Sequence, residues 1–157
     1  MKQEMVENLL KKTFGENHIK VNKTIGMGNP YNYRNKAQYP IGVNKSGEPV
    51  IGVYAKRSHE IIPMKECLIQ NRESEQIAFV LYKFLKDNNI KPYDEKTREG
   101  LFRHIVIKVG IRTHEIMCIL VINGKEIPEE KKLIKLLTTT FPNIKTIVKN
   151  INTKNTN

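Results

Sequence analysis

The sequence has few cysteines and no long hydrophobic run. Only two of its 157 residues are cysteine, Cys67 and Cys118, which is too few for a disulfide framework and favours a reduced compartment. Its longest apolar run, 116–122, has the length of a strand, whereas a helix needs roughly 20 apolar residues to cross a bilayer. The first residues lack the apolar core of a signal peptide. We therefore expect a cytoplasmic protein with no membrane partner.

The sequence also lacks the usual nucleotide-binding and metal-binding patterns. The Gly26-Met-Gly28 stretch has no third glycine and runs into Pro30 instead of a helix, so it is not a dinucleotide fingerprint, and no P-loop is present. The histidines are scattered and have no closely spaced histidine or cysteine neighbours, which argues against a closed zinc site. They are His18, His59, His104 and His114.

Positive charge is abundant and unevenly distributed. The chain has 27 Lys and Arg against 16 Asp and Glu, a formal net charge of +11. Residues 1–60 carry a net +5, residues 61–99 a net 0 and residues 100–157 a net +6. Such an excess favours a polyanionic partner, because neutralised phosphates release their counterions. The alternative is that basic surfaces only keep the protein soluble.

Hydrophobic periodicity predicts three helices and about five strands. The helices are expected over 2–14, over 72–88 with Asn71 as the cap, and from Pro128 to about residue 140. The strands are expected over 33–41, 50–54, 101–111, 115–122 and 144–151, with a short extended segment at 59–63. The apolar spacing of 144–151 also fits a helix, but its short length, its β-branched residues and Pro142 before it favour a strand. This order predicts an α+β fold with a mostly antiparallel sheet and about three helices packed on one face. We expect a single domain over 1–152 and a frayed tail over 153–157.

Details of the strand patterns give further expectations. Pro40 predicts an edge or an irregular stretch in the first strand, because proline has no backbone N–H to donate. The almost wholly apolar 115–122 strand should be central and covered. In the preceding strand His104, Lys108 and Arg112 should form an outward basic face.

A candidate RNA-binding segment lies before the first hairpin. The Tyr31-Asn-Tyr-Arg-Asn-Lys36 stretch interleaves side chains that hold phosphates, stack on unpaired bases and read base edges. Arg103 and His104, with the outward Lys108 and Arg112, form a second candidate. The alternative for both is that tyrosines pack against the fold and the charged groups are solvated.

Several motifs, in this order and spacing, resemble a known family. They are Asn29-Pro-Tyr-Asn-Tyr-Arg-Asn-Lys-Ala-Gln-Tyr39, Gly52-Val-Tyr54, Ser58-His-Glu-Ile-Ile62, Cys67-Leu-Ile-Gln70, Gly100-Leu-Phe-Arg-His-Ile-Val-Ile107, Thr113-His-Glu-Ile-Met117, Asn150-Ile-Asn152 and Thr156-Asn157. The family is that of the S-adenosylmethionine-dependent RNA (uracil-5-)-methyltransferases, which act on 23S ribosomal RNA and on tRNA. The resemblance extends over the whole chain.

The resemblance implies that the chain is the central domain of a larger enzyme. Family members commonly begin with a small RNA-binding β-barrel. Their catalytic half holds the methyl donor, a cysteine that attacks C6 of uracil and a carboxylate base. None of these motifs occurs here, so the chain alone is expected to be inactive and to bind no cofactor. Its expected partners are RNA, with 23S ribosomal RNA favoured, and the other domains of the same polypeptide.

The resemblance also implies roles for individual residues. Cys67 matches one ligand of a family [4Fe–4S] cluster whose other three cysteines would lie before Met1. Because such a cluster needs four thiolates, this chain alone should hold none. Arg34 and Lys36 match the family's basic pair at the hairpin entry, which faces RNA, and Arg103 and His104 match a second family motif. The expected RNA-binding residues are Tyr33, Arg34, Lys36, Arg103 and His104.

Two other hypotheses remain open at this stage. One is a free-standing basic RNA-binding module without enzymatic activity. The other is a scaffold domain whose positive charge is incidental. The first predicts RNA binding that weakens steeply with salt, and the second predicts no such dependence.

Overall fold

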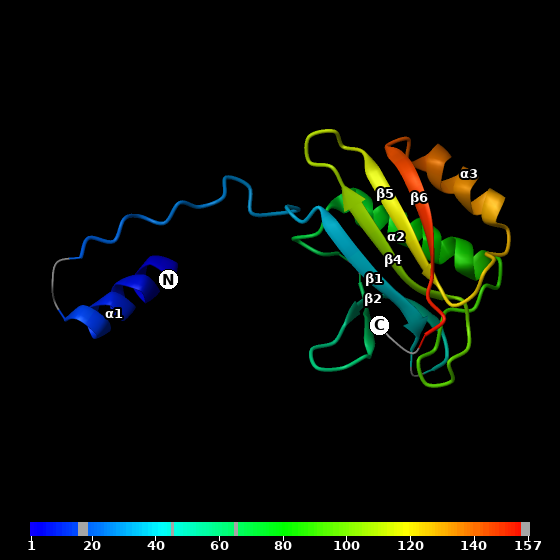
Figure 1. The fold of residues 1–157 in the computed structure, drawn as a ribbon, viewed down its shortest axis with the longest axis horizontal. Coiled ribbons are helices and arrows are strands. Elements are labelled where there is room, and N and C mark those ends of the chain that lie inside the picture. Colours follow the sequence, from blue (N-terminus) through cyan, green and yellow to red (C-terminus); the bar gives the residue numbers. More distant parts are fainter. Residues whose placement is uncertain (16–18, 45, 65, 155–157) are drawn as a thin grey trace. The chain divides into compact units, whose positions relative to one another are not determined.

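The structure is a computed structural model that describes residues 1–15, 19–44, 46–64 and 66–154 (Figure 1). The chain forms two compact units, Met1–Pro30 and Tyr31–Asn157. The sequence predicts a single domain over 1–152, and the boundary between the two units falls within that range. That this range is the central domain of a longer enzyme stays a prediction. Part of the expected tail, 155–157, lies outside the described residues, as do His18 and the Thr156-Asn157 match.

In the described part of the first unit the helix is α1 (Lys2–Phe14), which confirms the predicted range. The helix stops at Gly15, whose φ of 71° is a conformation that glycine adopts without strain. Within α1 the Gln3 amide donates a 2.9 Å hydrogen bond to the Glu7 carboxylate, one turn later. None of its residues is buried. The helix therefore depends on local hydrogen bonds more than on packing.

The second unit is a six-stranded sheet with two helices. In sequence order its elements are β1 (Lys36–Val43), β2 (Pro49–Tyr54), β3 (Ile61–Pro63), α2 (Arg72–Asp87), β4 (Phe102–Val109), β5 (Ile116–Ile122), α3 (Glu130–Thr140) and β6 (Ile144–Ile151). The strand order is β3-β2-β1-β4-β5-β6; β5 and β6 pair in parallel, and the other neighbouring strands pair antiparallel. The predicted α+β class is confirmed.

The hydrophobic core lies between the sheet and its two helices. Alternate residues of the strands face α2 and α3, as the period of two along a strand requires. Each fully buried aliphatic side chain contributes roughly 1.5–3 kcal/mol relative to an exposed one. The fully buried members include Tyr39, Ile77, Leu81, Leu85, Ile105, Ile107, Leu120, Leu133 and Leu137.

Helix α2 begins where the sequence predicts. The Asn71 side chain accepts a 3.2 Å hydrogen bond from the Ser74 backbone N–H, so Asn71 is the N-cap. Helix α3 begins two residues later than predicted, because Glu129 adopts a left-handed conformation with φ 55° and separates Pro128 from the helix. No helix among the described residues is both long and apolar enough to span a membrane.

Strand β1 changes its hydrogen-bonding partner at Pro40. The stretch 36–40 pairs with β4, and the stretch 41–43 pairs with β2. The predicted edge or irregular stretch is confirmed, although β1 as a whole lies between two other strands. The stretch 36–40 is paired with β4 alone, and the missing N–H of Pro40 falls where the ladder changes partner.

The sheet face opposite the helices, here called the open face, remains partly accessible. Figure 1 shows the strands lying in front of α2. Strand β5 is central, as predicted, but only every second residue is buried. Its other side chains, Met117, Ile119 and Val121, are half-buried. The prediction that this strand is covered is wrong for these three side chains, because α2 and α3 cover the opposite face.

Candidate nucleic-acid interface

The backbone before β1 is held against the segment that precedes α2. The Asn32 N–H donates to the Leu68 carbonyl at 2.8 Å, and the Arg34 N–H donates to the Ile69 carbonyl at 2.9 Å. Arg34 also forms a parallel bridge with Gln70. The side chains of Tyr33 and Arg34 nevertheless remain exposed. A fixed backbone thus presents an aromatic ring and a guanidinium group to solvent.

Lys36 and Lys108, the lysine pair, lie directly opposite each other on β1 and β4. Both are exposed, whereas the adjacent Ala37 and Ile107 are buried. The two ammonium groups therefore project from the open face. Like charges at directly opposed positions destabilise a sheet. The sequence pattern finds each lysine separately, but only the strand register shows that they are partners.

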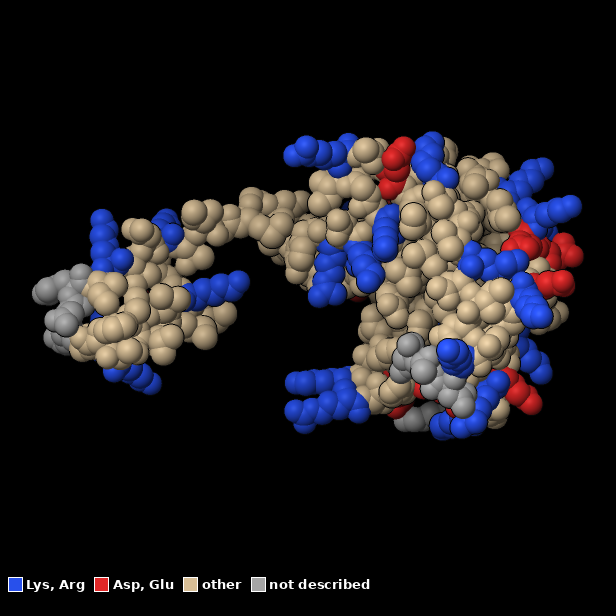
Figure 2. Space-filling model, viewed as in Figure 1, with Lys and Arg blue, Asp and Glu red and all other residues tan. Residues whose placement is uncertain are grey.

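The rest of the open face is mostly uncharged. The next row of the sheet places Gln38 opposite Val106 and Val106 opposite Ile119. Figure 2 shows this side of the second unit, where Lys and Arg side chains border a largely tan surface and Asp and Glu gather mainly at its margin. A surface of this composition suits a ligand that carries negative charge along its backbone.

Arg103 is buried, with 4% of its surface exposed. It lies in a β-bulge between Phe102 and His104, which turns a side chain away from its regular strand direction. Its Nη1 donates to the backbone carbonyls of Asn152 at 3.0 Å and Lys154 at 2.7 Å. Its guanidinium lies 4.4 Å from the centre of the Tyr93 ring. The predicted RNA contact of Arg103 stays a prediction, and its visible contacts are with the fold.

His104 is also buried, so its predicted place on an exposed basic strand face is wrong. Residues from the segments 54–61 and 93–96 form a pocket around this end of β4. The Nδ1 of His104 lies 2.6 Å from the Arg103 carbonyl, which can only accept, so Nδ1 donates and Nε2 is left as an acceptor. Burial, followed by the charge of Arg103, lowers the pKa of His104 below its usual value.

Arg112, which is predicted to share the outward strand face with His104 and Lys108, is exposed but lies in the turn after β4 and not on the strand.

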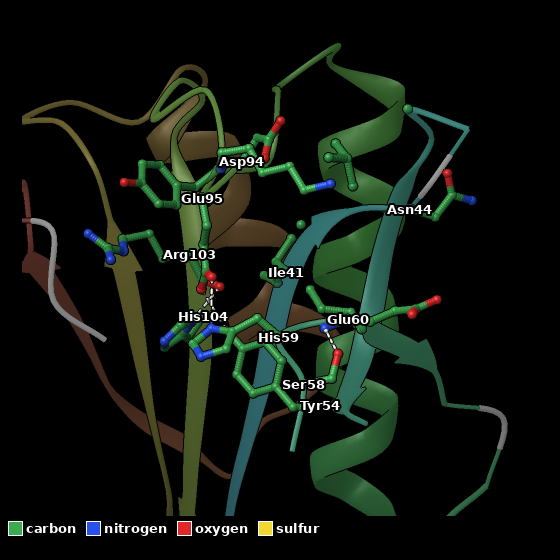
Figure 3. Close-up of a pocket in the computed structure, with 16 residues that line it drawn as sticks. Ile41, Asn44, Tyr54, Ser58, His59, Glu60, Asp94, Glu95, Arg103 and His104 are labelled. Carbon is green, nitrogen blue, oxygen red and sulfur yellow. Dashed lines mark hydrogen bonds and ion pairs between the residues drawn. The ribbon is translucent and has the colours of Figure 1, made fainter. Parts of the chain in front are cut away.

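The pocket beside His104, here called the Glu95 pocket, has a volume of about 640 Å³. The Glu95 carboxylate lies 2.8 Å from Nδ1 of His59 and accepts a 3.3 Å hydrogen bond from the Tyr54 hydroxyl. The rings of Tyr54 and His59 have their centres 5.5 Å apart. Figure 3 shows these side chains gathered with His104 at one end of the pocket. Burial, then Glu95, raises the pKa of Tyr54 to about 12.

Sequence reasoning missed the Glu95 pocket because its members are far apart in the chain. The motifs around His59 and around His104 both resemble those of a known family. Nothing in the sequence, however, indicates that they meet, and Glu95 belongs to neither motif. Only the fold brings the loop after β2 beside the loop before β4.

The two cysteines are in different surroundings. Cys118 is buried in β5, and burial raises the pKa of its thiol to about 12, as suits an unreactive core residue. Cys67 is half-buried, and its backbone N–H donates a 2.9 Å hydrogen bond to the Glu75 carboxylate. No group of three or more potential metal ligands occurs among the described residues. A [4Fe–4S] cluster needs four thiolates, so this chain does not fit a complete cluster and offers at most one ligand.

Comparison with known proteins gives relatives over the full length of the chain. No family model matches it. An uncharacterized RNA methyltransferase of Staphylococcus aureus strain COL is 40% identical over 157 residues, which are all of this chain and 35% of that protein. A counterpart from Staphylococcus epidermidis is 41% identical over the same length and is covered to 34%. The chain is a relative of RNA methyltransferases. It spans about a third of the length of these relatives.

A solved structure has the same fold as this chain. It is the Pyrococcus abyssi tRNA (uracil-54, C5)-methyltransferase in complex with S-adenosyl-L-homocysteine, which matches with a TM-score of 0.70 and 18% identity. The match covers 99% of this chain and 35% of that protein. The resemblance to RNA methyltransferases inferred from the sequence motifs is confirmed by these relatives, and the solved structure shows the shared fold. The activity, substrate and partners of the whole protein are matters for proposal.

Proposed function

We propose that this chain is the RNA-positioning part of an S-adenosylmethionine-dependent methyltransferase that acts on C5 of uracil in RNA, with 23S ribosomal RNA as the substrate. Its relatives are named RNA methyltransferases, and its fold matches part of a tRNA uracil methyltransferase. The proposed setting is the cytoplasm. The single observation that carries the proposal is the exposed lysine pair on the open face.

Like charges on directly opposed strand positions disfavour a sheet, and an anion bound between the lysine pair would offset that repulsion. Two ammonium groups on opposed positions of neighbouring strands repel each other, and water and salt screen this repulsion only in part. A phosphate placed between them would attract both. RNA offers such phosphates at regular intervals along its backbone. Repulsion within the pair would therefore favour the binding of a polyanion.

Arg34 and Tyr33, which precede β1, would bind different parts of the RNA. Arg34 extends the positive surface beyond the end of β1, and its guanidinium can bind a phosphate through two hydrogen bonds. Tyr33 offers an exposed ring on which an unpaired base can stack. Bound this way, the RNA is held while its target uridine leaves the stack. S-adenosylmethionine would supply the methyl group elsewhere in the longer enzyme, while the residues of this chain hold the RNA.

The proposal is tested by removing one charge at a time. Lys36→Ala and Lys108→Ala should each weaken the binding of a single-stranded, uridine-containing RNA by about fivefold, equivalent to about 1 kcal/mol. The measurement is fluorescence anisotropy at fixed salt concentration. Lys125→Ala is the matched control, because Lys125 is exposed in the turn after β5 and outside the open face. Equal losses in all three variants would contradict a specific role for the lysine pair.

A further inference from the structure

We propose that the Glu95 pocket binds an unpaired guanine base of the RNA, at a nucleotide distinct from the uridine that is methylated. This inference rests on the proposed function, because it supposes that RNA lies on this domain. The pocket lies between the loop after β2, the loop before β4 and the ends of β1 and β4 (Figure 3). Its volume of about 640 Å³ lies within the usual range for small-ligand sites and can enclose a base.

The Glu95 carboxylate is oriented before any ligand arrives. His59 and Tyr54 each hold one of its two oxygens, at 2.8 Å and 3.3 Å. An ionised carboxylate has about four acceptor positions, so these two interactions leave others available. The side chain of Glu95 is 37% exposed, which keeps its oxygens within reach of a ligand. The pocket thus presents a fixed pair of hydrogen-bond acceptors.

Guanine is the base whose edge fits two adjacent acceptors. Its N1–H and its exocyclic N2 amino group donate side by side. Adenine and cytosine each place an acceptor nitrogen beside their amino group, and uracil places carbonyl oxygens on both sides of its single N–H. A carboxylate repels these acceptors. The chemistry of Glu95 therefore selects guanine over the other three bases.

His104 adds another acceptor to the pocket. Because its Nδ1 donates to the Arg103 carbonyl, its Nε2 can only accept while the ring is neutral. Burial, followed by the charge of Arg103, lowers the pKa of His104, which favours the neutral ring. Nε2 is therefore suited to a remaining donor of the nucleotide, such as a ribose hydroxyl. The two histidines thus have different tasks, since His59 orients Glu95.

The aromatic rings of the pocket supply a stacking surface. The Tyr54 and His59 rings are tilted by 49° to each other, and the His59 side chain is 63% exposed. An exposed imidazole ring can stack on an unpaired base. Stacking alone does not distinguish the four bases, so discrimination depends on Glu95.

The charges of the pocket argue against a phosphate or a metal ion as the ligand. Three carboxylates line it, from Glu60, Asp94 and Glu95, against two basic groups, Lys96 and Arg103. The Arg103 guanidinium already donates to two backbone carbonyls. Among the described residues no cluster could hold a metal ion. Hydrogen-bond donors, and not negative charge, are what this pocket attracts.

The pocket and the lysine pair can be reached by one RNA strand. Strand β1 begins at Lys36 and has reached the pocket at Ile41. Five residues of extended chain span about 17 Å. A few nucleotides of single-stranded RNA cover that distance. The lysine pair would therefore hold the backbone while the Glu95 pocket reads one base.

The test compares four mononucleotides that share a phosphate and differ in the base. GMP, AMP, CMP and UMP are added to the full chain at millimolar concentrations while the imidazole NMR signals of His59 and His104 are followed. GMP should shift both signals and bind about fivefold more tightly than the others. Glu95→Gln should abolish this preference. Glu99→Gln, on the same loop but outside the pocket, is the matched control and should preserve it.

The outcomes separate this inference from the proposed function. Silent imidazole signals, or equal affinity for all four nucleotides, would overturn the guanine pocket. So would a loss of guanine preference in Glu99→Gln equal to that in Glu95→Gln. The proposed function is tested by the lysine variants instead. RNA binding that depends on Lys36 and Lys108 while the imidazole signals stay silent would refute the pocket alone.

Discussion

Arg103 joins parts of the second unit that lie far apart in the chain. Its guanidinium lies over the Tyr93 ring and donates to the carbonyls of Asn152 and Lys154, beyond the end of β6. A buried guanidinium is tolerated only when its donors are paired, and here the planar group faces both an aromatic ring and two carbonyls. At this position the bulge in β4 serves the fold.

Arg103→Lys should destabilise the protein without changing its net charge. A lysine ammonium cannot reproduce the planar group over Tyr93 together with two hydrogen bonds, so the free energy of unfolding should fall by about 1–3 kcal/mol. Urea unfolding followed by circular dichroism measures this change. Arg112→Lys, in the exposed turn after β4, is the control and should stay within about 0.5 kcal/mol. Equal stability of the two variants would contradict a structural role for Arg103.

Strand β1 connects the two candidate binding features. Its first half pairs with β4 and sets the lysine pair in register, and its second half pairs with β2 and forms part of the pocket wall. Ala37 and Tyr39 face the core, while Lys36 and Gln38 face the open side. A shift of one residue in this strand would bury Lys36 and expose Tyr39. The buried side chains of β1 thus fix where its charged side chains lie.

Replacing one member of the lysine pair should change stability and binding in opposite directions. Lys108→Glu turns a repulsive pair into an attractive one, which should raise the free energy of unfolding by about 0.5 kcal/mol. The same change should weaken RNA binding more than Lys108→Ala does. Thermal unfolding and RNA anisotropy measure the two effects.

Lys125→Glu is the control for this substitution, because it changes the net charge equally but lies outside the sheet. It should not raise stability and should weaken RNA binding less. A lower stability of Lys108→Glu would show that Lys36 and Lys108 do not repel each other in the folded protein.

At the scale of the whole molecule, the neutral and the positively charged stretches of the sequence occupy different parts of the fold. The neutral stretch 61–99 contains α2, which covers the inner face of the sheet. The strands of the lysine pair come from the two positively charged stretches on either side of it. Folding therefore brings charge from distant parts of the sequence onto one surface, as expected for a protein that binds a polyanion.

Features set by the local sequence could be predicted, whereas features set by contacts between distant residues could not. The α2 helix followed from its side-chain spacing, which is a local property. The apolar spacing of 144–151 fits a helix, and the strand β6 was predicted from its short length, its β-branched residues and Pro142 before it. The burial of His104 could not be predicted, since it depends on loops that lie elsewhere in the sequence. Only part of the lysine pair could be predicted. The alternation of apolar and polar residues predicts that Lys108 is exposed, but that Lys36 lies opposite it depends on the strand register. His59 and Glu95 are 36 residues apart in the sequence, and no local pattern predicts their contact.

The most direct test of the account is the salt dependence of RNA binding. The measurement is the slope of log affinity against log salt concentration, for the wild type and for the variant with Arg34→Ala, Lys36→Ala and Lys108→Ala combined. Each phosphate contact to a single strand contributes about 0.7 to this slope, so three lost contacts should reduce it by about 2. An unchanged slope in the triple variant, or RNA binding by the wild type that ignores salt, would contradict the account.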